Sequence, residues 1–346
     1  MRREPKRRAK SASGKSKITP AAKPAYGRVA AKPAYGRVAL VGIGLIGSSM
    51  ARAIGRGRLA GHVACWSRTA ETRAAARRLQ ICDSVHDRLV DAVKGADLVV
   101  LCAPLGANAG LAKTIGPALK SGATLSDVGS VKEAVVRDVA PHLPEGVHFV
   151  PGHPVAGTEH SGPEAGFAEL FEGRWCILTP PKGTNRAAVE RLAKFWRAMG
   201  SKIELMDPAH HDRVLAITSH LPHLLAYTIV ATVTDLEDHL TREARDKGYV
   251  IDRGEVVKFS AGGFRDFTRI VASDPVMWRD VFLNNREAVL EMLGRFSEDL
   301  TALQRAIRWG EGEKLETLFR RTREIRRGII EAGQAGTFKA TEEKKQ

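Results

Sequence analysis

The stretch Gly36–Ile54, GRVALVGIGLIGSSMARAI, decides the fold of this 346-residue chain. Its apolar run Arg37–Val41 predicts a β-strand. The spacing of apolar residues over Ile46–Ile54 predicts a helix, and glycines fill the short segment between the two. A strand, a glycine turn and a helix in this order are typical of the start of a doubly wound α/β domain.

The glycine turn has the spacing GxGxxG. Its glycines permit a tight turn, a close approach of the backbone to a pyrophosphate and close packing of helix on strand, while the helix N-terminus favours an anion. In this strand–turn–helix context the pattern predicts a dinucleotide site. We expect the cofactor to bind at Gly42, Gly44, Leu45, Ile46 and Gly47.

The end of the second predicted strand, His62–Trp66, indicates which dinucleotide. About 20 positions after the glycines, NAD-dependent enzymes usually carry an acidic residue for the adenosine ribose. Here Ser67, Arg68 and Thr69 take that place. Arg68 can pair bidentately with a 2′-phosphate, assisted by the two hydroxyls. NADP is therefore the preferred cofactor, and NAD stays possible if Arg68 is only a surface residue.

Short apolar runs alternate with helical patterns from Gly36 to Glu204, which predicts a parallel sheet wrapped by helices. After Met206 only helical patterns remain. The predicted strands are Arg37–Val41, His62–Trp66, Leu98–Cys102, Thr124–Asp127, His148–Pro151, Trp175–Thr179 and Lys202–Leu205. The predicted helices are Ile46–Ile54, Thr69–Leu79, Ala187–Met199, Pro208–Thr218, Pro222–Leu236, Pro275–Ile307 and Gly312–Ala332.

These patterns divide the chain into four parts. Residues 1–35 form a basic tail, in which the nonapeptide AKPAYGRVA of 22–30 recurs as 31–39. A dinucleotide-binding domain is expected over 36–206, a helical domain over 207–332 and a polar end over 333–346. Residues 1–25 hold nine Lys or Arg and one Glu, so the tail supplies +8 of the net charge of +15. We therefore expect no nucleic-acid partner for the folded part.

Composition favours a globular protein, with 43% hydrophobic and 27% charged residues. No uninterrupted apolar run approaches the ~20 residues of a membrane span, and no signal peptide precedes the fold, so no membrane partner and a cytoplasmic location are expected. Neither the four cysteines nor any His or carboxylate set has the spacing of metal ligands, so no metal is expected.

Four further segments are unusually polar for their setting: Ser126–Lys132, Gly152–Glu159, Ser219–His223 and Gly262–Arg269. The first two follow predicted strands and should lie at the carboxyl edge of the sheet, where open α/β folds bind ligands. The other two belong to the helical part.

With the glycine turn, these segments resemble the prephenate and arogenate dehydrogenases of tyrosine biosynthesis, in order and spacing, over Gly36–Ala332. The resemblance implies a Rossmann-type domain followed by an all-α dimerisation domain like the C-terminal domain of 6-phosphogluconate dehydrogenase, and a homodimer. It also implies the reaction. Prephenate would give 4-hydroxyphenylpyruvate, or arogenate would give tyrosine, by oxidative decarboxylation with hydride transfer to NAD(P).

The chemistry needs an acceptor for the proton of the ring hydroxyl, and imidazole suits this task. The resemblance assigns it to His153 of the Gly-His-Pro segment. It implies that Ser130 hydrogen-bonds the same hydroxyl or orients His153. A guanidinium suits the ring carboxylate, and Arg269 is the candidate, unless it forms a surface ion pair with Asp266.

The resemblance also implies residues at the side-chain end of the substrate. His223 and Ser219 would contact that end, although a structural helix histidine would look similar, and Arg265 would meet it as well. Glu159 would close an ionic gate over the pocket.

The resemblance also implies that Trp278 is an aromatic residue near the active site, where packing and substrate contact are equally expected. His210 and His211 are adjacent, point to different faces of a helix, and are interpreted as structural.

Two other functions fit the same two-part plan. A β-hydroxy-acid dehydrogenase would use a lysine on the helical domain, where this chain has histidine and arginine. A catalytically silent dinucleotide sensor would not need His153, Ser130 and Arg269 together.

Overall fold

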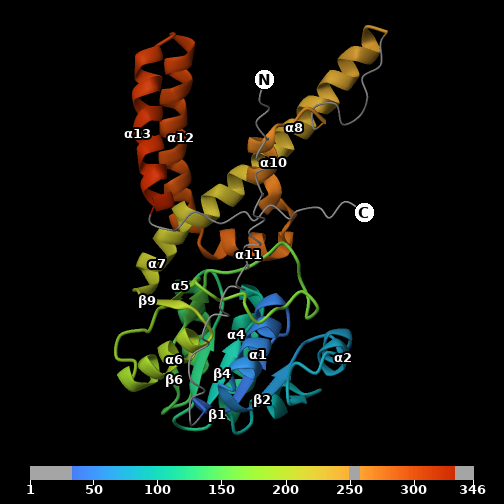
Figure 1. Ribbon diagram of the computed structural model, residues 1–346, viewed down its shortest axis with the longest axis vertical. Coiled ribbons are helices and arrows are strands. Elements are labelled where there is room, and N and C mark those ends of the chain that lie inside the picture. Colours follow the sequence, from blue (N-terminus) through green and yellow to red (C-terminus); the bar gives the residue numbers. More distant parts are fainter. Residues whose placement is uncertain (1–32, 249–257, 332–346) are drawn as a thin grey trace, which may run out of the picture.

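The computed structural model describes residues 33–248 and 258–331. An α/β domain lies below a set of long helices (Figure 1). Its main sheet has six parallel strands in the order β3-β2-β1-β4-β5-β6, which confirms the predicted Rossmann-type fold. The strands are β1 Tyr35–Val41, β2 Ala60–Trp66, β3 Ser84–Val85, β4 Leu98–Leu101, β5 Thr124–Asp127 and β6 His148–Phe149.

Helices cover both faces of this sheet, which is why its central strands read as continuous apolar runs. In β1, Val38 and Leu40 join the core beneath α1 and α6, whereas Ala39 and Val41 join the core beneath α4 and α5. The helices are α1 Leu45–Gly57, α2 Ala70–Arg78, α3 Leu89–Val93, α4 Asn108–Ile115, α5 Glu133–Val139 and α6 Arg186–Ala198.

A second, three-stranded sheet was not predicted. It has the order β7-β8-β9, with β7 (Gly152–Pro154) antiparallel to β8 (Trp175–Leu178) and β8 parallel to β9 (Lys202–Leu205). The prediction placed β8 and β9 in the main sheet and missed β7. Three residues that include a glycine and a proline carry no strand signal. The finding matters because β7 contains His153.

The first strand begins at Tyr35, two residues before the predicted start. Tyr35 is fully buried, meets Phe195 edge to face at 5.2 Å and lies under the Arg191 guanidinium at 4.1 Å. The first copy of the duplicated nonapeptide lies outside the described residues, as do nearly all of the basic tail and the polar end.

The helical part extends away from the sheets (Figure 1). The segment predicted as one helix over Pro275–Ile307 is two helices, because Asn285 leaves helical geometry at φ −110° and ψ 34°. A π-helix, Ala216–His220, joins the first two helices. The helices are α7 Pro208–Leu215, α8 Leu221–Asp246, α10 Gly262–Thr268, α11 Pro275–Asn284, α12 Arg286–Arg308 and α13 Gly312–Glu331.

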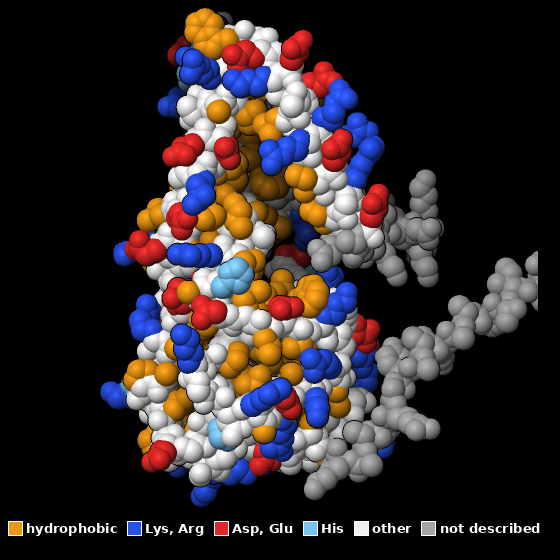
Figure 2. Space-filling model, turned by 90° about the vertical axis from the view of Figure 1, so that its left-hand side faces the viewer, with side chains coloured by type: hydrophobic (Ala, Val, Ile, Leu, Met, Phe, Trp, Pro, Cys, Tyr) orange, Lys and Arg blue, Asp and Glu red, His pale blue; other side chains and the backbone are white. Residues whose placement is uncertain are grey.

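These helices expose much apolar surface. The antiparallel helices α12 and α13 stand apart from the sheets (Figure 1), and Figure 2 shows hydrophobic side chains gathered along the hollow of the helical half. Ile307 is 67% exposed and Phe319 is 56% exposed. The continuous helical stretch Pro208–Asp246 is long and apolar enough to cross a membrane by length and composition alone, with a mean hydropathy of 1.5 over its most apolar window. The sequence analysis did not predict this apolar helix, because polar residues interrupt its apolar run.

The glycine turn yields a test of packing. A Cβ at Gly47 would lie 2.1 Å from the Gly42 carbonyl oxygen, whereas a Cβ at Gly55 of the same helix would meet nothing within 4 Å. We expect Gly47→Ala to lower the free energy of unfolding by about 1–3 kcal/mol. Gly55→Ala should raise it by about 0.5–1 kcal/mol. Urea denaturation measures both, and equal effects would show that the turn is not tightly packed.

Candidate active site

The glycine turn forms a cradle at the start of α1. Gly42 has φ +106°, and its N–H donates to the Trp66 carbonyl at 2.8 Å. A Cβ there would lie 2.4 Å from the Cys102 carbonyl oxygen, so only glycine fits. The position of a Cβ on Gly44, by contrast, faces open space. The backbone at the α1 N-terminus is thus open to a ligand, which fits the pyrophosphate of a dinucleotide.

The segment after β2 lies at the adenosine end of this cradle. Ser67 is half-buried and Arg68 is exposed. The Thr69 hydroxyl caps α2, accepting from the Thr72 N–H at 3.2 Å and lying 2.8 Å from the Thr72 hydroxyl. The predicted help of Thr69 to Arg68 therefore competes with capping. No carboxylate ends β2.

A buried ion pair joins the two polar segments at the carboxyl edge of the sheet. The Lys132 ammonium lies 2.5 Å from an Asp127 oxygen and donates to the Gly152 carbonyl at 2.7 Å, and both side chains are fully buried. Asp127 also accepts from the N–H of Gly129 at 2.7 Å and of Gly152 at 3.1 Å. Burial lowers the pKa of Lys132, and Asp127 opposes this shift. Because a buried charge without its partner is strongly destabilising, this pair fixes the Ser130 segment against β7.

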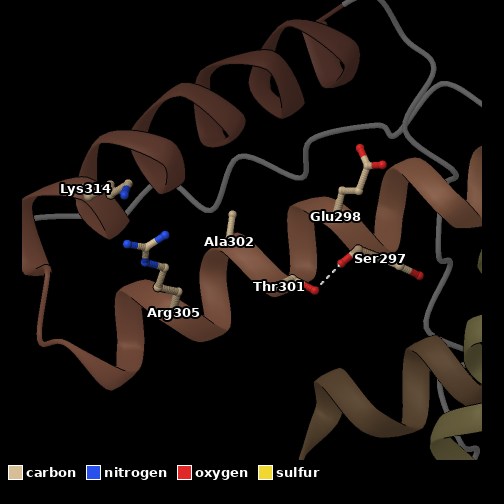
Figure 3. Close-up of a pocket in the computed structure, with 6 residues that line it drawn as sticks. All are labelled: Ser297, Glu298, Thr301, Ala302, Arg305 and Lys314. Atoms are coloured by element: carbon tan, nitrogen blue, oxygen red, sulfur yellow. Dashed lines mark hydrogen bonds between the residues drawn. The ribbon is translucent and has the colours of Figure 1, made fainter.

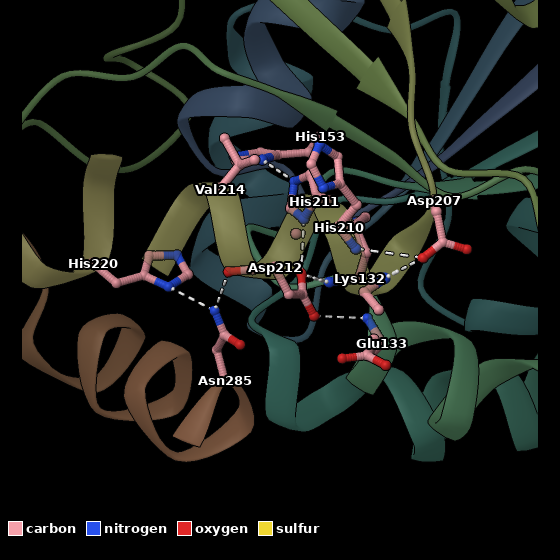
Figure 4. Close-up of polar contacts among 12 residues, drawn as sticks. Lys132, Glu133, His153, Asp207, His210, His211, Asp212, Val214, His220 and Asn285 are labelled. Carbon is pink, nitrogen blue, oxygen red and sulfur yellow. Dashed lines mark hydrogen bonds and ion pairs between the residues drawn. The ribbon is translucent and has the colours of Figure 1, made fainter. Parts of the chain in front are cut away.

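His153 of β7 is the end of a buried polar chain (Figure 4). Its Nδ1 lies 2.9 Å from Nε2 of His211, and Nδ1 of His211 lies 2.7 Å from Oδ1 of Asp212. The Asp212 carboxylate also accepts the backbone N–H groups of Lys132, at 2.7 Å, and Glu133, at 2.9 Å. The chain therefore connects α7 of the helical part to the start of α5 and to β7.

These contacts determine the position of each ring proton. Since every other partner of the Asp212 carboxylate is a donor, Asp212 accepts from Nδ1–H of His211. Neutral His211 then has an unprotonated Nε2, which accepts from Nδ1–H of His153. His153 is left with a lone pair on Nε2, the atom a general base needs.

The electrostatics keep His153 in this neutral form. The side chain is only 7% exposed. Burial lowers its pKa well below the usual 6.5, and the neighbouring His211 and Lys132 add to the shift. At neutral pH the ring is therefore ready to accept a proton.

The helical part contributes a second histidine, His223 of α8. Its Nδ1 donates to the Ser219 carbonyl at 2.8 Å, which leaves Nε2 for a ligand. The ring stacks on Trp278 of α11 with centroids 3.6 Å apart. Trp278 is 7% exposed and belongs to a core of the α/β domain, so it packs and also positions His223.

His220 lies between these groups and was not singled out. Its Nδ1 is 3.0 Å from the Asn285 amide nitrogen, which donates to the Asp212 carbonyl oxygen at 2.9 Å (Figure 4). Burial lowers the pKa of His220 to about 4, so its Nδ1 is an acceptor at neutral pH. Asn285 thereby attaches α12 to both α7 and the π-helix.

An ion pair connects the fourth polar segment of the sequence to the second. Arg269 lies 3.5 Å from Glu159, with side chains 49% and 35% exposed. Arg265 is exposed on α10. Within the described ranges, the side chains of Ser130 and Arg265 form no hydrogen bond, so Ser130 does not contact His153 there.

Sequence reasoning missed three members of the polar chain. His211 is fully buried and His210 is exposed, so the two do point to different faces, but His211 contacts His153. Asp212 and Asn285 were not considered. One signal in the sequence could have indicated this chain: Asp212 stands directly after His211 on the first helix after the α/β domain.

A hollow of about 500 Å³ lies elsewhere, between α12 and α13 (Figure 3). It contains none of the candidate residues and is not the site described above. Its lining residues are Ser297, Glu298, Thr301, Ala302, Arg305 and Lys314.

Comparisons with known proteins agree with this geometry. A family model described as "Prephenate dehydrogenase, nucleotide-binding domain" matches residues 50–205, and one described as "Prephenate dehydrogenase, dimerization domain" matches residues 207–321. The cyclohexadienyl dehydrogenase of Zymomonas mobilis is 41% identical over 83% of this chain and 94% of its own length. The prephenate dehydrogenase of Bacillus subtilis is 33% identical over 81% of this chain and 72% of its own.

A crystal structure of the prephenate dehydrogenase of Aquifex aeolicus, in complex with hydroxyphenyl propionate and NAD+, is similar as well. It superposes with a TM-score of 0.74 at 34% identity, covering 85% of this chain and 98% of the other. These matches extend over both parts of the fold. The chain therefore belongs to the prephenate/cyclohexadienyl dehydrogenase family, the NAD(P)-dependent oxidoreductases of tyrosine biosynthesis.

Proposed function

We propose that this enzyme oxidises and decarboxylates prephenate, arogenate or both, with His153 as the general base. The observation that carries the proposal is the buried chain from Asp212 through His211 to His153, which leaves a lone pair on Nε2 of His153 at the carboxyl edge of the sheet. The bound nicotinamide supplies a hydride acceptor. Nε2 of His153 takes the hydroxyl proton as the carbinol C–H bond breaks. Cleavage of the ring–carboxylate bond then releases carbon dioxide and leaves a phenolate, which takes up a proton to become the phenol.

The chain from Asp212 supports proton transfer by orientation and charge. As His153 gains the proton, its positive charge forms in a buried setting, where the hydrogen bond to His211 and the nearby carboxylate of Asp212 stabilise it. Ser130, on the segment fixed by Asp127 and Lys132, would donate to or accept from the substrate hydroxyl.

The substrate carries two negative groups or more, and the helical part supplies donors for them. Arg269 would bind the ring carboxylate, exchanging its ion pair with Glu159 for a bidentate one. His223, Ser219 and Arg265 would contact the side-chain end. Glu159 then acts as the gate that is displaced when substrate enters.

NADP is the proposed preferred cofactor, bound at the turn Gly42–Gly47. In support, Ser67 and Arg68 occupy the place where an NAD enzyme usually carries a carboxylate. NAD remains possible, since the cradle for the pyrophosphate does not discriminate between the two cofactors.

A homodimer in the cytoplasm is the proposed assembly and location. The matched dimerisation domain and the exposed apolar faces of α8, α12 and α13 support the dimer. A second copy would cover these faces, including the apolar stretch Pro208–Asp246. The proposed domain limits are those of the sequence, 36–206 and 207–332.

The function is tested by following absorbance at 340 nm with prephenate and arogenate, each offered with NAD and NADP. We expect turnover with at least one of the two substrates and a KM for NADP below that for NAD. Absence of turnover with both substrates would overturn the proposed reaction. A lower KM for NAD would overturn only the cofactor preference.

The pH dependence tests His153. The base must be neutral to act, so kcat/KM rises with pH through the pKa of His153 and then levels off. Because burial lowers this pKa, the midpoint should lie below 6.5. His153→Asn should remove this limb and cut kcat by about 10²–10⁴-fold. His210→Asn, an exposed histidine on α7, serves as the control. A midpoint above 6.5 would argue against a buried neutral base.

The role of Asp212 is tested by Asp212→Asn. An amide cannot accept from all three of its donors, so the His211 tautomer and with it the lone pair of His153 are no longer fixed. We expect kcat to fall about 10²-fold or more with little change in KM. Asp207→Asn is a matched control, because Asp207 caps the same helix through Ala209 and His210 and asparagine caps equally well. Equal losses in both variants would refute the orienting role.

A further inference from the structure

The side chain of Arg73 holds the turn Ser67–Thr69 between β2 and α2 through hydrogen bonds to two backbone carbonyls. Nη1 of Arg73, on the first turn of α2, donates to the Ser67 carbonyl at 2.9 Å and to the Arg68 carbonyl at 3.0 Å. Its Nε lies 3.1 Å from Asp87, and the side chain is only 15% exposed. The turn is thus bound to a fixed guanidinium.

This arrangement determines where the backbone donors point. In a trans peptide the N–H lies opposite the C=O, so turning the Ser67 and Arg68 carbonyls toward Arg73 turns the N–H groups of Arg68 and Thr69 the other way. Within residues 33–248 and 258–331, neither N–H donates a hydrogen bond. Two neighbouring amide donors therefore stay available to an anionic ligand.

The charges around the turn also favour an anion. Asp87 lies next to this turn, and its backbone carbonyl accepts from Trp66 Nε1 at 3.3 Å. Its side chain is paired with Arg77 at 2.8 Å and with Arg73 at 3.1 Å. These two guanidinium groups hold the pKa of Asp87 below its usual range, and their two positive charges outweigh its single negative one. The guanidinium of Arg68 is exposed and, in the described part of the chain, makes no ion pair.

We propose that Arg73 is a specificity-determining residue of the cofactor site. By holding both carbonyls, it keeps the N–H groups of Arg68 and Thr69 directed at the place where Arg68 would bind the 2′-phosphate of NADP. NAD carries only a neutral hydroxyl there, so Arg73 acts chiefly on the affinity for NADP and little on that for NAD. The inference rests on the proposed cofactor site.

The experiment measures binding of NADP, NAD and 2′,5′-ADP by calorimetry to the full chain, without substrate. Arg73→Ala should weaken NADP and 2′,5′-ADP about tenfold, since a charge-assisted hydrogen bond is worth about 1.5–3 kcal/mol. NAD affinity should stay within about twofold. Arg73→Lys should also weaken NADP, because one ammonium cannot replace the fork that reaches Asp87 and both carbonyls.

Arg77→Ala is the matched control. Arg77 also pairs with Asp87, but it donates to the Val85 carbonyl and not to the turn. Its loss should leave the NADP-to-NAD affinity ratio nearly unchanged. Thermal unfolding of each variant shows whether α2 is still folded, and unchanged NAD affinity is a second check.

The outcomes separate this inference from the cofactor preference. If wild type binds NAD more tightly and Arg73→Ala still lowers the NADP-to-NAD ratio, the preference is wrong and the role of Arg73 holds. If Arg73→Ala leaves the ratio unchanged, or if Arg77→Ala lowers it equally, the role of Arg73 is overturned.

Discussion

The carboxylate of Asp212 is the constraint on which the site depends. It lies on α7, the first helix after the α/β domain, and accepts the two backbone N–H groups at the start of α5. The same carboxylate orients His211, and the backbone carbonyl of Asp212 accepts from Asn285 of α12. One residue therefore docks the helical part on the sheet, fixes the tautomer of His153, the proposed base, and attaches α12. The junction between the domains and the proposed acid–base chemistry therefore depend on the same residue, Asp212.

Such a concentration of buried polar groups is stable because the charged groups in it, Asp127, Lys132 and Asp212, are paired. Asp127 and Lys132, both fully buried, satisfy each other and three backbone groups. The Asp212 carboxylate accepts from Nδ1–H of His211 and from the backbone N–H groups of Lys132 and Glu133. Because a half-satisfied network is costlier than an apolar core, the geometry tolerates little variation. That rigidity keeps the lone pair of His153 at one position, which proton transfer requires.

The sequence predicted the parallel sheet because its local signals agree: a glycine turn after an apolar strand and regular alternation with helices. Through motifs it also gave His153, His223 and Arg269 as candidate site residues, and their roles stay predictions. It could not predict the contact of His153 with His211, which are 58 residues apart, because pairing between β7 and a helix of the other domain leaves no local pattern. The strand β7 itself is too short to detect. The break at Asn285 escaped because the apolar period continues from α11 into α12 across it.

The proposed cofactor site and the proposed acid–base site are built from different parts of the fold, which affects how each can vary. The turn that would select the cofactor lies between β2 and α2 and is held by Arg73, which pairs with Asp87. All these contacts lie within the α/β domain. The acid–base chain and the ion pair of Arg269 with Glu159 need both domains. A substitution at Arg68 or Arg73 therefore leaves Asp212 and its docking contacts in place. Cofactor preference can change without disturbing the proposed catalytic base, whereas a change at the domain junction alters the docking of the domains, the His153 tautomer and the proposed gate together.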